Sequence, residues 1–319
     1  MSSPTLTDKV SKMIRQDILN GELTPGQKLV VADLKNRYNV GASPIREALV
    51  QLSWSKYVKL EPQKGCWVSP VSKKELNDLY ESLRVVSSVL LKKAISAGDE
   101  SWELDVLTSY HKLSRVQYVS EEFDCVEWEE RHQQFHVALL EGADSENMFK
   151  FFDDLINQVK RYRFLAMSAE NASDDLFNID EHEMIMKLVL AKNIEQATEL
   201  LDQHLLGSMK RIEEILQKRA HVAEMYNEVL KDIPGIQLPP TPEQGKMSWF
   251  VYVIQIPERD KMMQRLLDKG IQSRGYFKPI HLQPLYQEQF GYKRGDFPNA
   301  ERFHKNSLKL PVWHDTKDE

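Results

Sequence analysis

Residues 40–68 constrain the fold of this chain more than any other stretch. Ser43 is suited to cap a helix, and Pro44 is tolerated in a first helical turn because the missing N–H has no helical partner there. Arg46 and Gln51 are predicted to point outward, because they fall outside the apolar face. That face follows the i, i+3, i+4, i+7 spacing of one buried helix side: Ile45, Ala48, Leu49 and Leu52.

Two short β-like runs follow this helix, at residues 57–61 and 66–68, and they flank Gln63-Lys64-Gly65. A glycine at the tip between two such runs is typical of a β-hairpin. A capped helix with an outward arginine and a basic hairpin, in this order, predicts a winged helix-turn-helix. The alternative, an amphipathic core helix alone, leaves the hairpin unexplained.

The same stretch resembles the DNA-binding domain of GntR-type bacterial transcription regulators. That family carries roughly Val-Ser-Arg-Thr-Pro-Val-Arg-Glu-Ala-Leu and then a Pro-x-x-Gly-x-Phe-Val wing. The positions kept here are Val40, Pro44, Arg46, Glu47, Ala48, Leu49, Pro62, Gly65 and Val68. Ala32 and Ala42 replace frequent arginines, which puts the operator sequence in doubt more than DNA binding itself.

The resemblance implies that residues 1–70 form a winged helix-turn-helix domain that binds a double-stranded DNA operator. Arg46 is the leading contact, because a guanidinium fork suits guanine or phosphate oxygens. Candidate DNA contacts are Ser43, Arg46, Gln51, Lys64 and Gly65. The net charge of the whole chain is −6, but residues 1–70 hold 10 Lys and Arg against 6 Asp and Glu. Residues 71–208 hold 14 against 27, and such an acidic second domain disfavours DNA binding in the wrong orientation.

Cysteine content and hydropathy indicate the compartment. Cys66 and Cys125 are the only cysteines, which argues against a disulfide framework and for a reducing cytoplasm. The N-terminus is polar and lacks the basic and apolar regions of a secretory signal. No apolar run approaches the roughly 18 residues of a membrane helix. We therefore expect a soluble, cytoplasmic protein without a membrane partner.

Residues 71–209 are helical in pattern throughout, and they resemble the all-helical effector-binding FCD domain of one GntR branch. Leu79-Tyr-Glu-Ser-Leu-Arg84 is close to the Leu-Tyr-Glu-x-Arg of that domain, although Arg84 lies one residue further along. Ser88 replaces the glutamate that commonly follows. The resemblance implies a homodimer that responds to a small carboxylate, most commonly as a repressor relieved by its effector.

Four histidines carry the chemistry of this helical domain. His132 and His136 are spaced i, i+4, which places both rings on one helix face. The metal site of the FCD family uses an Asp and a His at this spacing and then two later histidines. His136, His182 and His204 match it, and His132 replaces the Asp. Such a set suits Zn²⁺, with Ni²⁺ as an alternative, better than Mg²⁺ or Ca²⁺.

Some of these assignments leave alternatives open. Each histidine alone is more simply a core or surface imidazole, and participation of His132 is the most open of the four. Glu129 and Glu130 lie close enough in sequence to substitute for a ligand or to accept a hydrogen bond from one. Replacing Asp by His removes a negative charge, so an anionic effector should be attracted more strongly. Arg84, Arg161 and Arg163 are candidate partners for its carboxylate, with surface ion pairing as the alternative, particularly for the last two.

From about residue 210 the chain resembles the C-terminal small domain of DegT-type pyridoxal-phosphate sugar aminotransferases. The segments that carry this resemblance include Gly-Lys-Met-Ser-Trp-Phe-Val-Tyr-Val and Pro-Ile-His-Leu-Gln-Pro-Leu-Tyr. The pattern predicts a helix to Lys231, a loop and then further elements. Expected are a loop at 232–245, strands at 249–256, 271–277 and 308–312, and a helix at 259–269.

That enzyme family needs a cofactor-binding aspartate and a Schiff-base lysine, and both precede this small domain. Lys246 and Lys278 lie in the wrong motifs to replace the lysine. We therefore expect no pyridoxal phosphate and no enzymatic activity. An aminotransferase-related fusion enzyme and a partner-recruiting module remain the alternatives for residues 210–319. The fold class expected overall is mainly α: a winged helix-turn-helix, an all-α helical-bundle effector domain and a small α+β segment.

Overall fold

The structure is a computed structural model of the 319-residue chain. It divides into two compact units, Met1–Glu214 and Ile215–Glu319. The described residues are 5–19, 21–116, 124–167, 177, 179–240, 249, 251–276 and 278–312. Some predicted features lie outside the described residues. These are Lys246, the predicted loop beyond residue 240, and residues 250 and 277 of two predicted strands. Within the described ranges, no helix combines the length and hydropathy that crossing a membrane requires.

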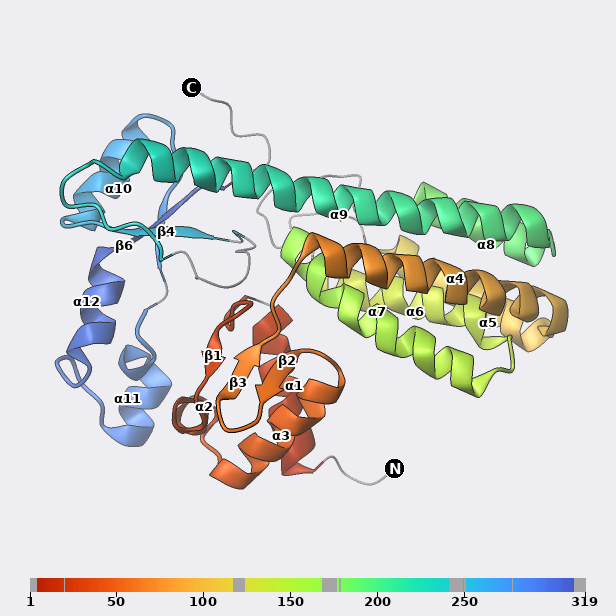
Figure 1. The fold of residues 1–319 in the computed structure, drawn as a ribbon, viewed down its shortest axis with the longest axis horizontal. Helices are drawn as coiled ribbons and strands as arrows, with labels where there is room; N and C mark the ends of the chain where they lie inside the picture. Colours follow the sequence, from red (N-terminus) through yellow and green to blue (C-terminus); the bar gives the residue numbers. More distant parts are fainter. Residues whose placement is uncertain are drawn as a thin grey trace. The chain divides into compact units, whose positions relative to one another are not determined.

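Three helices and a small sheet form the N-terminal domain (Figure 1). The helices are α1 (Leu6–Leu19), α2 (Val31–Tyr38) and α3 (Ala42–Trp54). The strands are β1 (Lys28–Leu29), β2 (Val58–Glu61) and β3 (Gly65–Val68), in the antiparallel order β1-β3-β2. One core joins helices and sheet through Val10, Ile14, Ile45, Ala48, Leu49 and Val58. The predicted winged helix-turn-helix is therefore confirmed.

The start of α3 differs from the predicted cap. Gly41 occupies the N-cap position with an extended backbone (φ −64°, ψ 166°). Ser43 lies inside the first turn, and its hydroxyl donates a hydrogen bond to Glu47 Oε1 at 2.9 Å. The expectation that Ser43 caps this helix was wrong. The reason is local: Asn39 ends α2 in a left-handed conformation (φ 54°), and this turn brings Gly41 to the cap.

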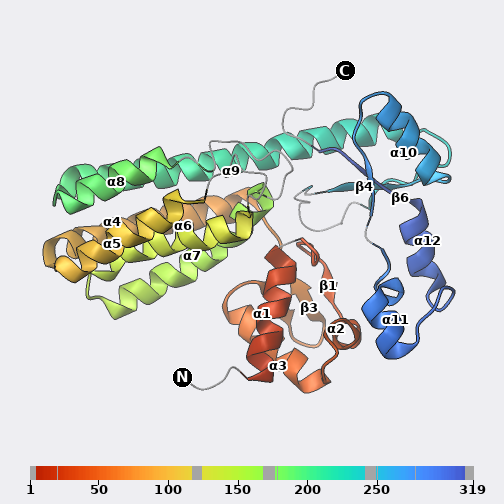
Figure 2. The same ribbon diagram turned by 180° about the vertical axis from the view of Figure 1, so that it is seen from behind.

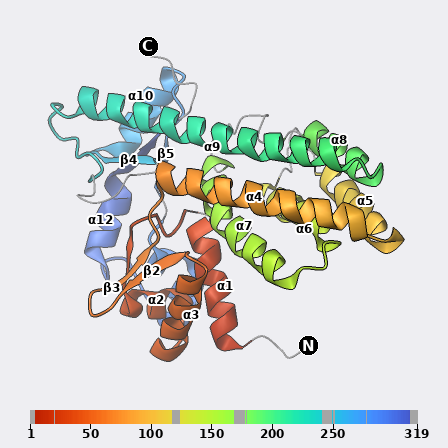
Figure 3. The ribbon, with the colours of Figure 1, turned by 45° about the vertical axis from the view of Figure 1, so that its right-hand side comes forward.

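The wing is the β2–β3 hairpin, which is visible in Figure 3. Leu60 pairs with Cys66 and Glu61 with Gly65, so the strands join through a short turn. Gly65 has φ +134°, a conformation that residues with a side chain rarely adopt. The predicted glycine at the hairpin tip is confirmed, and its physical reason is this backbone angle.

The rest of the first unit is a bundle of helices, which lie side by side in Figures 1 and 2. They are α4 (Lys73–Ala97), α5 (Glu100–Ser114), α6 (Cys125–Glu141), α7 (Glu146–Met167), α8 (Asp180–Leu190) and the first part of α9 (Ile194–Leu230). Ser72 caps α4, since its hydroxyl accepts the Glu75 N–H at 3.1 Å. The bundle core includes Leu90, Phe135, Leu139, Tyr162, Val189 and Leu201.

One glycine sets how closely α5 packs at the end of α4. Trp102 of α5 is buried against Gly98, where an added Cβ would come within 2.0 Å of the indole. The same indole donates its Nε1–H to the Ala138 carbonyl of α6 at 2.8 Å. Trp102 therefore ties three helices together, and a side chain at Gly98 would displace it.

The second unit begins inside α9, which is one continuous 37-residue helix. Its later residues Val222 and Ala223 are buried in the core of this unit, together with Trp249, Tyr252, Ile254, Leu308 and Leu310. Removing the helix after residue 214 would therefore also remove part of that core.

A three-stranded antiparallel sheet completes the core of the second unit. The strands β4 (Tyr252–Gln255), β5 (Arg274–Gly275) and β6 (Ser307–Leu310) lie in the order β4-β6-β5. The helical elements are α10 (Arg259–Asp268), η2 (Ile280–Leu282), α11 (Pro284–Phe290) and α12 (Pro298–Asn306). All three predicted strands are present but shorter than expected. The small α+β character of this segment is confirmed.

Candidate metal centre

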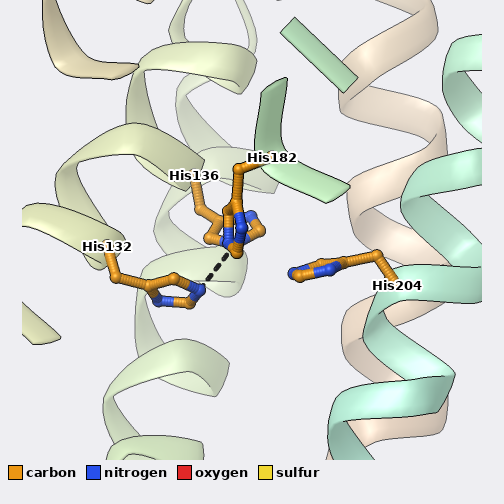
Figure 4. Close-up of side chains that lie close together, drawn as sticks. All are labelled: His132, His136, His182 and His204. Carbon is orange, nitrogen blue, oxygen red and sulfur yellow. Dashed lines mark hydrogen bonds between the residues drawn. The ribbon is translucent and has the colours of Figure 1, made fainter. Parts of the chain in front are cut away.

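Four imidazoles from three helices meet inside the first unit. His132 and His136 come from α6, His182 from α8 and His204 from α9. One ring nitrogen of each lies within 4.8 Å of one nitrogen of every other, and all four side chains are buried. Figure 4 shows the rings pointing toward a common centre. The sequence predicted this set, and the structure brings all four members together, His132 included.

The spacing of the nitrogens fits a transition-metal ion with some rotation of the rings. Nε2 of His132 and Nε2 of His136 lie 3.1 Å apart and share a hydrogen bond. A tetrahedral zinc with Zn–N distances of about 2.1 Å places its ligand atoms roughly 3.4 Å apart. The separation of 3.1 Å is slightly shorter than this value, and the limit of 4.8 Å for all pairs exceeds it by an amount that imidazole rotations can remove. The donor set therefore fits a buried divalent metal.

Burial keeps the histidines in the form that binds a metal. The pKa values of His132 and His136 lie well below the usual 6.5, chiefly because burial disfavours the charged imidazolium. Arg163 contributes to both lowered pKa values, because its positive charge disfavours a positive charge on either imidazole. The pKa of His204 is lowered as well, first by burial, and Glu181 opposes this shift. Neutral imidazoles have a lone pair available for a metal ion.

Glu181 orients one of the rings. Nδ1–H of His204 donates to Glu181 Oε2 at 2.7 Å, which leaves Nε2 as the nitrogen available to the centre. This hydrogen bond lowers the pKa of Glu181, and Arg211 lies 3.5 Å from the same carboxylate oxygen. Sequence reasoning named Glu129 and Glu130 as acceptors and missed Glu181. The available signal was its position directly before His182.

Arg163 stands beside the centre. Its Nε donates to Glu129 Oε2 at 2.8 Å, and its guanidinium lies over the Trp128 ring, 5.5 Å from the ring centroid. Trp128 in turn stacks on His132 at 4.6 Å between centroids. Arg163 Nη1 also donates to Ser208 Oγ at 3.2 Å. A positive side chain, held by hydrogen bonds to Glu129 and Ser208, is thus separated from His132 by the Trp128 ring.

The other two predicted effector arginines are engaged elsewhere. Arg84 makes a two-pronged pair with Asp202, at 2.8 and 2.6 Å. Arg161 pairs with Glu75 at 3.2 Å and donates to the Pro70 carbonyl at 3.5 Å. Surface ion pairing was the alternative for Arg161 and Arg163, but both are buried. Of the three arginines, only Arg163 is shown in contact with the residues around the histidines.

The candidate DNA contacts lie on the recognition helix and the wing. Arg46 is exposed on α3, and Lys64 is exposed next to Gly65 and lies 3.3 Å from Glu61. Gln51 is half-buried, and its amide donates to Asp8 of α1 at 3.5 Å. This contact joins the end of α3 to the start of α1, and the role of Gln51 in DNA binding stays a prediction.

The lowered pKa values predict a pH dependence of folding for the metal-free protein. Imidazoles that stay neutral in the folded state take up protons near pH 6.5 once the chain unfolds. The unfolded state then binds more protons, so the free energy of unfolding should fall as pH decreases below about 6.5. Thermal unfolding between pH 7.5 and 5.5 in a chelator measures this. His136→Gln should flatten the slope, and a midpoint independent of pH would contradict the predicted neutral cluster.

A winged helix-turn-helix joined to a helical bundle with a buried histidine centre is the architecture of a DNA-binding transcription regulator. Residues 6–68 match the model of the bacterial regulatory proteins of the gntR family, and residues 78–207 match the FCD domain. Over 208 residues the chain is 33% identical to the HTH-type transcriptional repressor GlaR of Escherichia coli, covering 64% of this chain and 94% of GlaR. This chain belongs to the GntR family of transcription regulators, in the branch that carries an FCD domain.

Two further similarities cover different parts of the chain. The solved structure of E. coli McbR/YncC aligns with a TM-score of 0.56 over 66% of this chain and 99% of that chain, at 17% identity, which shows a shared fold. Residues 196–319 match the DegT/DnrJ/EryC1/StrS aminotransferase family. Over 121 residues the chain is 35% identical to the spore coat polysaccharide biosynthesis protein SpsC of Bacillus subtilis. That match spans 36% of this chain and only 31% of SpsC.

Proposed function

We propose that this protein is a transcription regulator, acting as a repressor, whose helical domain senses a small organic acid through a histidine-ligated metal. The observation that carries the proposal is the buried set of four imidazoles in a chain of the GntR family. We assign residues 1–70 to DNA binding, 71–209 to effector and metal binding, and 210–319 to an aminotransferase-like segment. The protein acts on a duplex operator in the cytoplasm.

The charges around the centre support an anionic effector. His132, His136, His182 and His204 would hold the ion, and Zn²⁺ is the best match to four nitrogen donors. When bound, the metal would supply a Lewis-acid position for a carboxylate oxygen by expanding from four ligands to five. Neutral imidazoles leave its positive charge uncompensated, and the charge of Arg163 is already balanced by Glu129. A negatively charged ligand would restore neutrality in this buried site.

The three helices that supply the histidines let effector binding change the packing of the helical domain. An acid bound among α6, α8 and α9 changes how these helices pack. In a homodimer with two winged helices, such a change alters the spacing of the two recognition helices and so couples effector and operator affinity. A repressor of this design would release its operator when the acid binds. The similarity to GlaR, a transcriptional repressor, supports repression as the mode of action.

The test combines DNA binding with a carboxylate screen on the zinc-loaded, full-length protein. A ligand of the folded state raises the unfolding midpoint, so succinate and acetate serve as the first dicarboxylate and monocarboxylate probes. The expected result is that a carboxylate that raises the midpoint also weakens binding to operator DNA. If the protein ignores duplex DNA of every composition at low ionic strength, the proposed function fails.

The C-terminal unit should be dispensable for DNA binding. A chain that stops after Glu214 retains the winged helix and the four histidines and loses the second unit as a whole. We expect its operator affinity to equal that of the full chain in a fluorescence titration. The far-ultraviolet circular dichroism of both proteins serves as the folding control. Loss of DNA binding by a folded, truncated chain would show that the tail is structural.

An enzyme remains the second candidate because residues 196–319 match an aminotransferase family. We propose that the chain is not one. Lys278 is exposed in a motif unlike that of the Schiff-base lysine, and Lys246 lies outside the described residues. After incubation with pyridoxal phosphate and gel filtration, the full-length protein should show no Schiff-base absorbance band. A band that borohydride reduction fixes covalently to the protein would overturn this assignment.

A further inference from the structure

The second unit carries an apolar surface that its own core does not use. Helices α11 and α12 bury none of their residues, and none belongs to the hydrophobic core around Trp249 and Tyr252. Residues 280–303, which we call the aromatic arm, expose large apolar side chains. The exposed fraction lies between 41% and 64% for five of them: Ile280, Leu285, Phe290, Phe297 and Phe303.

The rings of the aromatic arm form one continuous run. Tyr286 stacks with Phe290 at 6.2 Å between ring centroids, and Phe290 with Tyr292 at 5.6 Å. Tyr292 meets Phe297 edge-on at 5.5 Å, and Phe297 reaches His281 at 4.8 Å. Single exposed apolar residues are ordinary on protein surfaces. Here the exposed Phe290 and Phe297 are joined through the half-buried Tyr292, and such a patch is typical of an interaction site.

Polar contacts hold this arm in shape. His281 is buried, and its Nε2 lies 2.9 Å from Glu301 Oε1. The Gly295 N–H donates to the same oxygen at 2.7 Å, which ties the loop before α12 to η2. The arm is therefore a formed surface and not a loose segment. An apolar surface that is preorganised loses little entropy when a partner covers it.

The charge of the arm limits the chemistry of its partner. Residues 280–303 contain three Lys and Arg and three Asp and Glu. This balance gives no electrostatic attraction for a nucleic-acid backbone. The aromatic content instead matches the buried centre of a protein–protein interface, where Tyr and Phe are enriched and charges depleted.

The comparison with SpsC bears on the class of the partner. The matched segment is 35% identical to SpsC but represents only 31% of that polypeptide, so more than two thirds of it has no counterpart in that match. In SpsC the corresponding segment is covalently joined to this larger part, whereas in this chain a GntR domain and an FCD domain precede the matched segment. We propose that the aromatic arm docks onto the larger part of a separate DegT-family polypeptide and so attaches an aminotransferase-type protein to the regulator.

The experiment reconstitutes this contact in trans. The probe is SpsC without the segment that matches residues 196–319, co-expressed with the tagged full-length regulator. SpsC truncated in this way is first paired with its own missing segment. If truncated SpsC and its own segment co-elute, the truncated protein is competent to bind and serves as the probe. If they do not, another DegT-family relative that passes the same test takes its place. The readout is co-elution of the two chains in size-exclusion chromatography.

Surface variants decide whether the arm makes the contact. Leu285→Asp with Phe290→Asp places two charges in the arm, and both positions are exposed, so folding should be preserved. The matched control is Val229→Asp with Leu267→Asp, two exposed apolar positions of the same unit outside the arm. We expect the unmodified chain and the control to co-elute with the probe, and the arm variant to lose at least tenfold in bound probe.

Three results would overturn the proposal. The first is the absence of a complex with a probe that binds its own segment. The second is a complex that the arm variant forms as well as the control does. The third is a larger oligomer of the full-length regulator alone that only the arm variant disrupts, because the occupant would then be a second copy of this chain. Titration of the same variants with operator DNA tests the DNA-binding function separately, so a failure of the docking proposal can be told apart from a failure of the proposed function.

Discussion

Replacing His182 with alanine should remove most of the metal from the purified protein. His182 comes from α8 and is the only one of the four imidazoles on that helix. Its loss leaves a gap in the ligand shell and separates α8 from the centre, so affinity for zinc should fall by more than the roughly 10- to 100-fold that loss of an outer hydrogen-bonding partner costs. Metal analysis after chelation and reconstitution measures the retained zinc.

The matched control for this experiment is His111→Ala. His111 is exposed on α5 and does not belong to the cluster, so its removal should leave the metal content unchanged. His132→Ala provides a graded comparison, because His132 stands at the position where the FCD resemblance places an aspartate. Zinc content of His182→Ala equal to that of the unmodified protein would count against the metal centre as a whole.

Replacing Arg46 with alanine should weaken operator binding by roughly 1–3 kcal/mol if its guanidinium makes a bidentate contact. Arg46 is exposed on α3, the recognition helix, while the neighbouring Ile45 is fully buried and fixes the orientation of the helix. Truncation at position 46 therefore removes a contact without opening the core. A fluorescence titration with operator DNA at fixed ionic strength measures the change.

Two further variants separate a specific contact from general loss of charge. Lys93→Ala removes an exposed cation from α4 of the helical domain and should leave operator affinity unchanged. Lys64→Ala removes an exposed wing cation and should reduce the salt dependence of binding for all DNA sequences alike. An operator titration of Arg46→Ala that overlays the unmodified protein would refute the role of Arg46.

The local pattern was enough to predict the winged helix, and the resemblance to the FCD domain implied the membership of the histidine cluster. Hairpins and amphipathic helices are specified by residues close together in the chain, so Gly65 and the apolar face of α3 could be read directly. Ser43 shows the limit of this reasoning. A serine before a helical run is a good cap in isolation, but the left-handed turn at Asn39 gave that position to Gly41.

The surroundings of the histidines needed the tertiary structure. Arg84, Arg161 and Arg163 were equivalent candidates in the sequence, and only folding separated them. Asp202 and Glu75 neutralise the first two, while Arg163 lies over the Trp128 ring that stacks on His132. Partners separated by tens or hundreds of residues leave no periodic signal, because side-chain pairing across helices depends on how the helices pack.

The sequence by itself determined the class of the DNA-reading domain and placed His132 and His136 on one helix face, because local spacing sets which side chains share a face. The resemblance to the FCD domain implied that His182 and His204 join them. Only the tertiary structure decided that Glu181 orients His204, that Gln51 faces α1, and that one helix serves both units. It also showed that α11 and α12 bury nothing of their own. Burial is a property of the packed chain, so no local pattern could have specified these contacts.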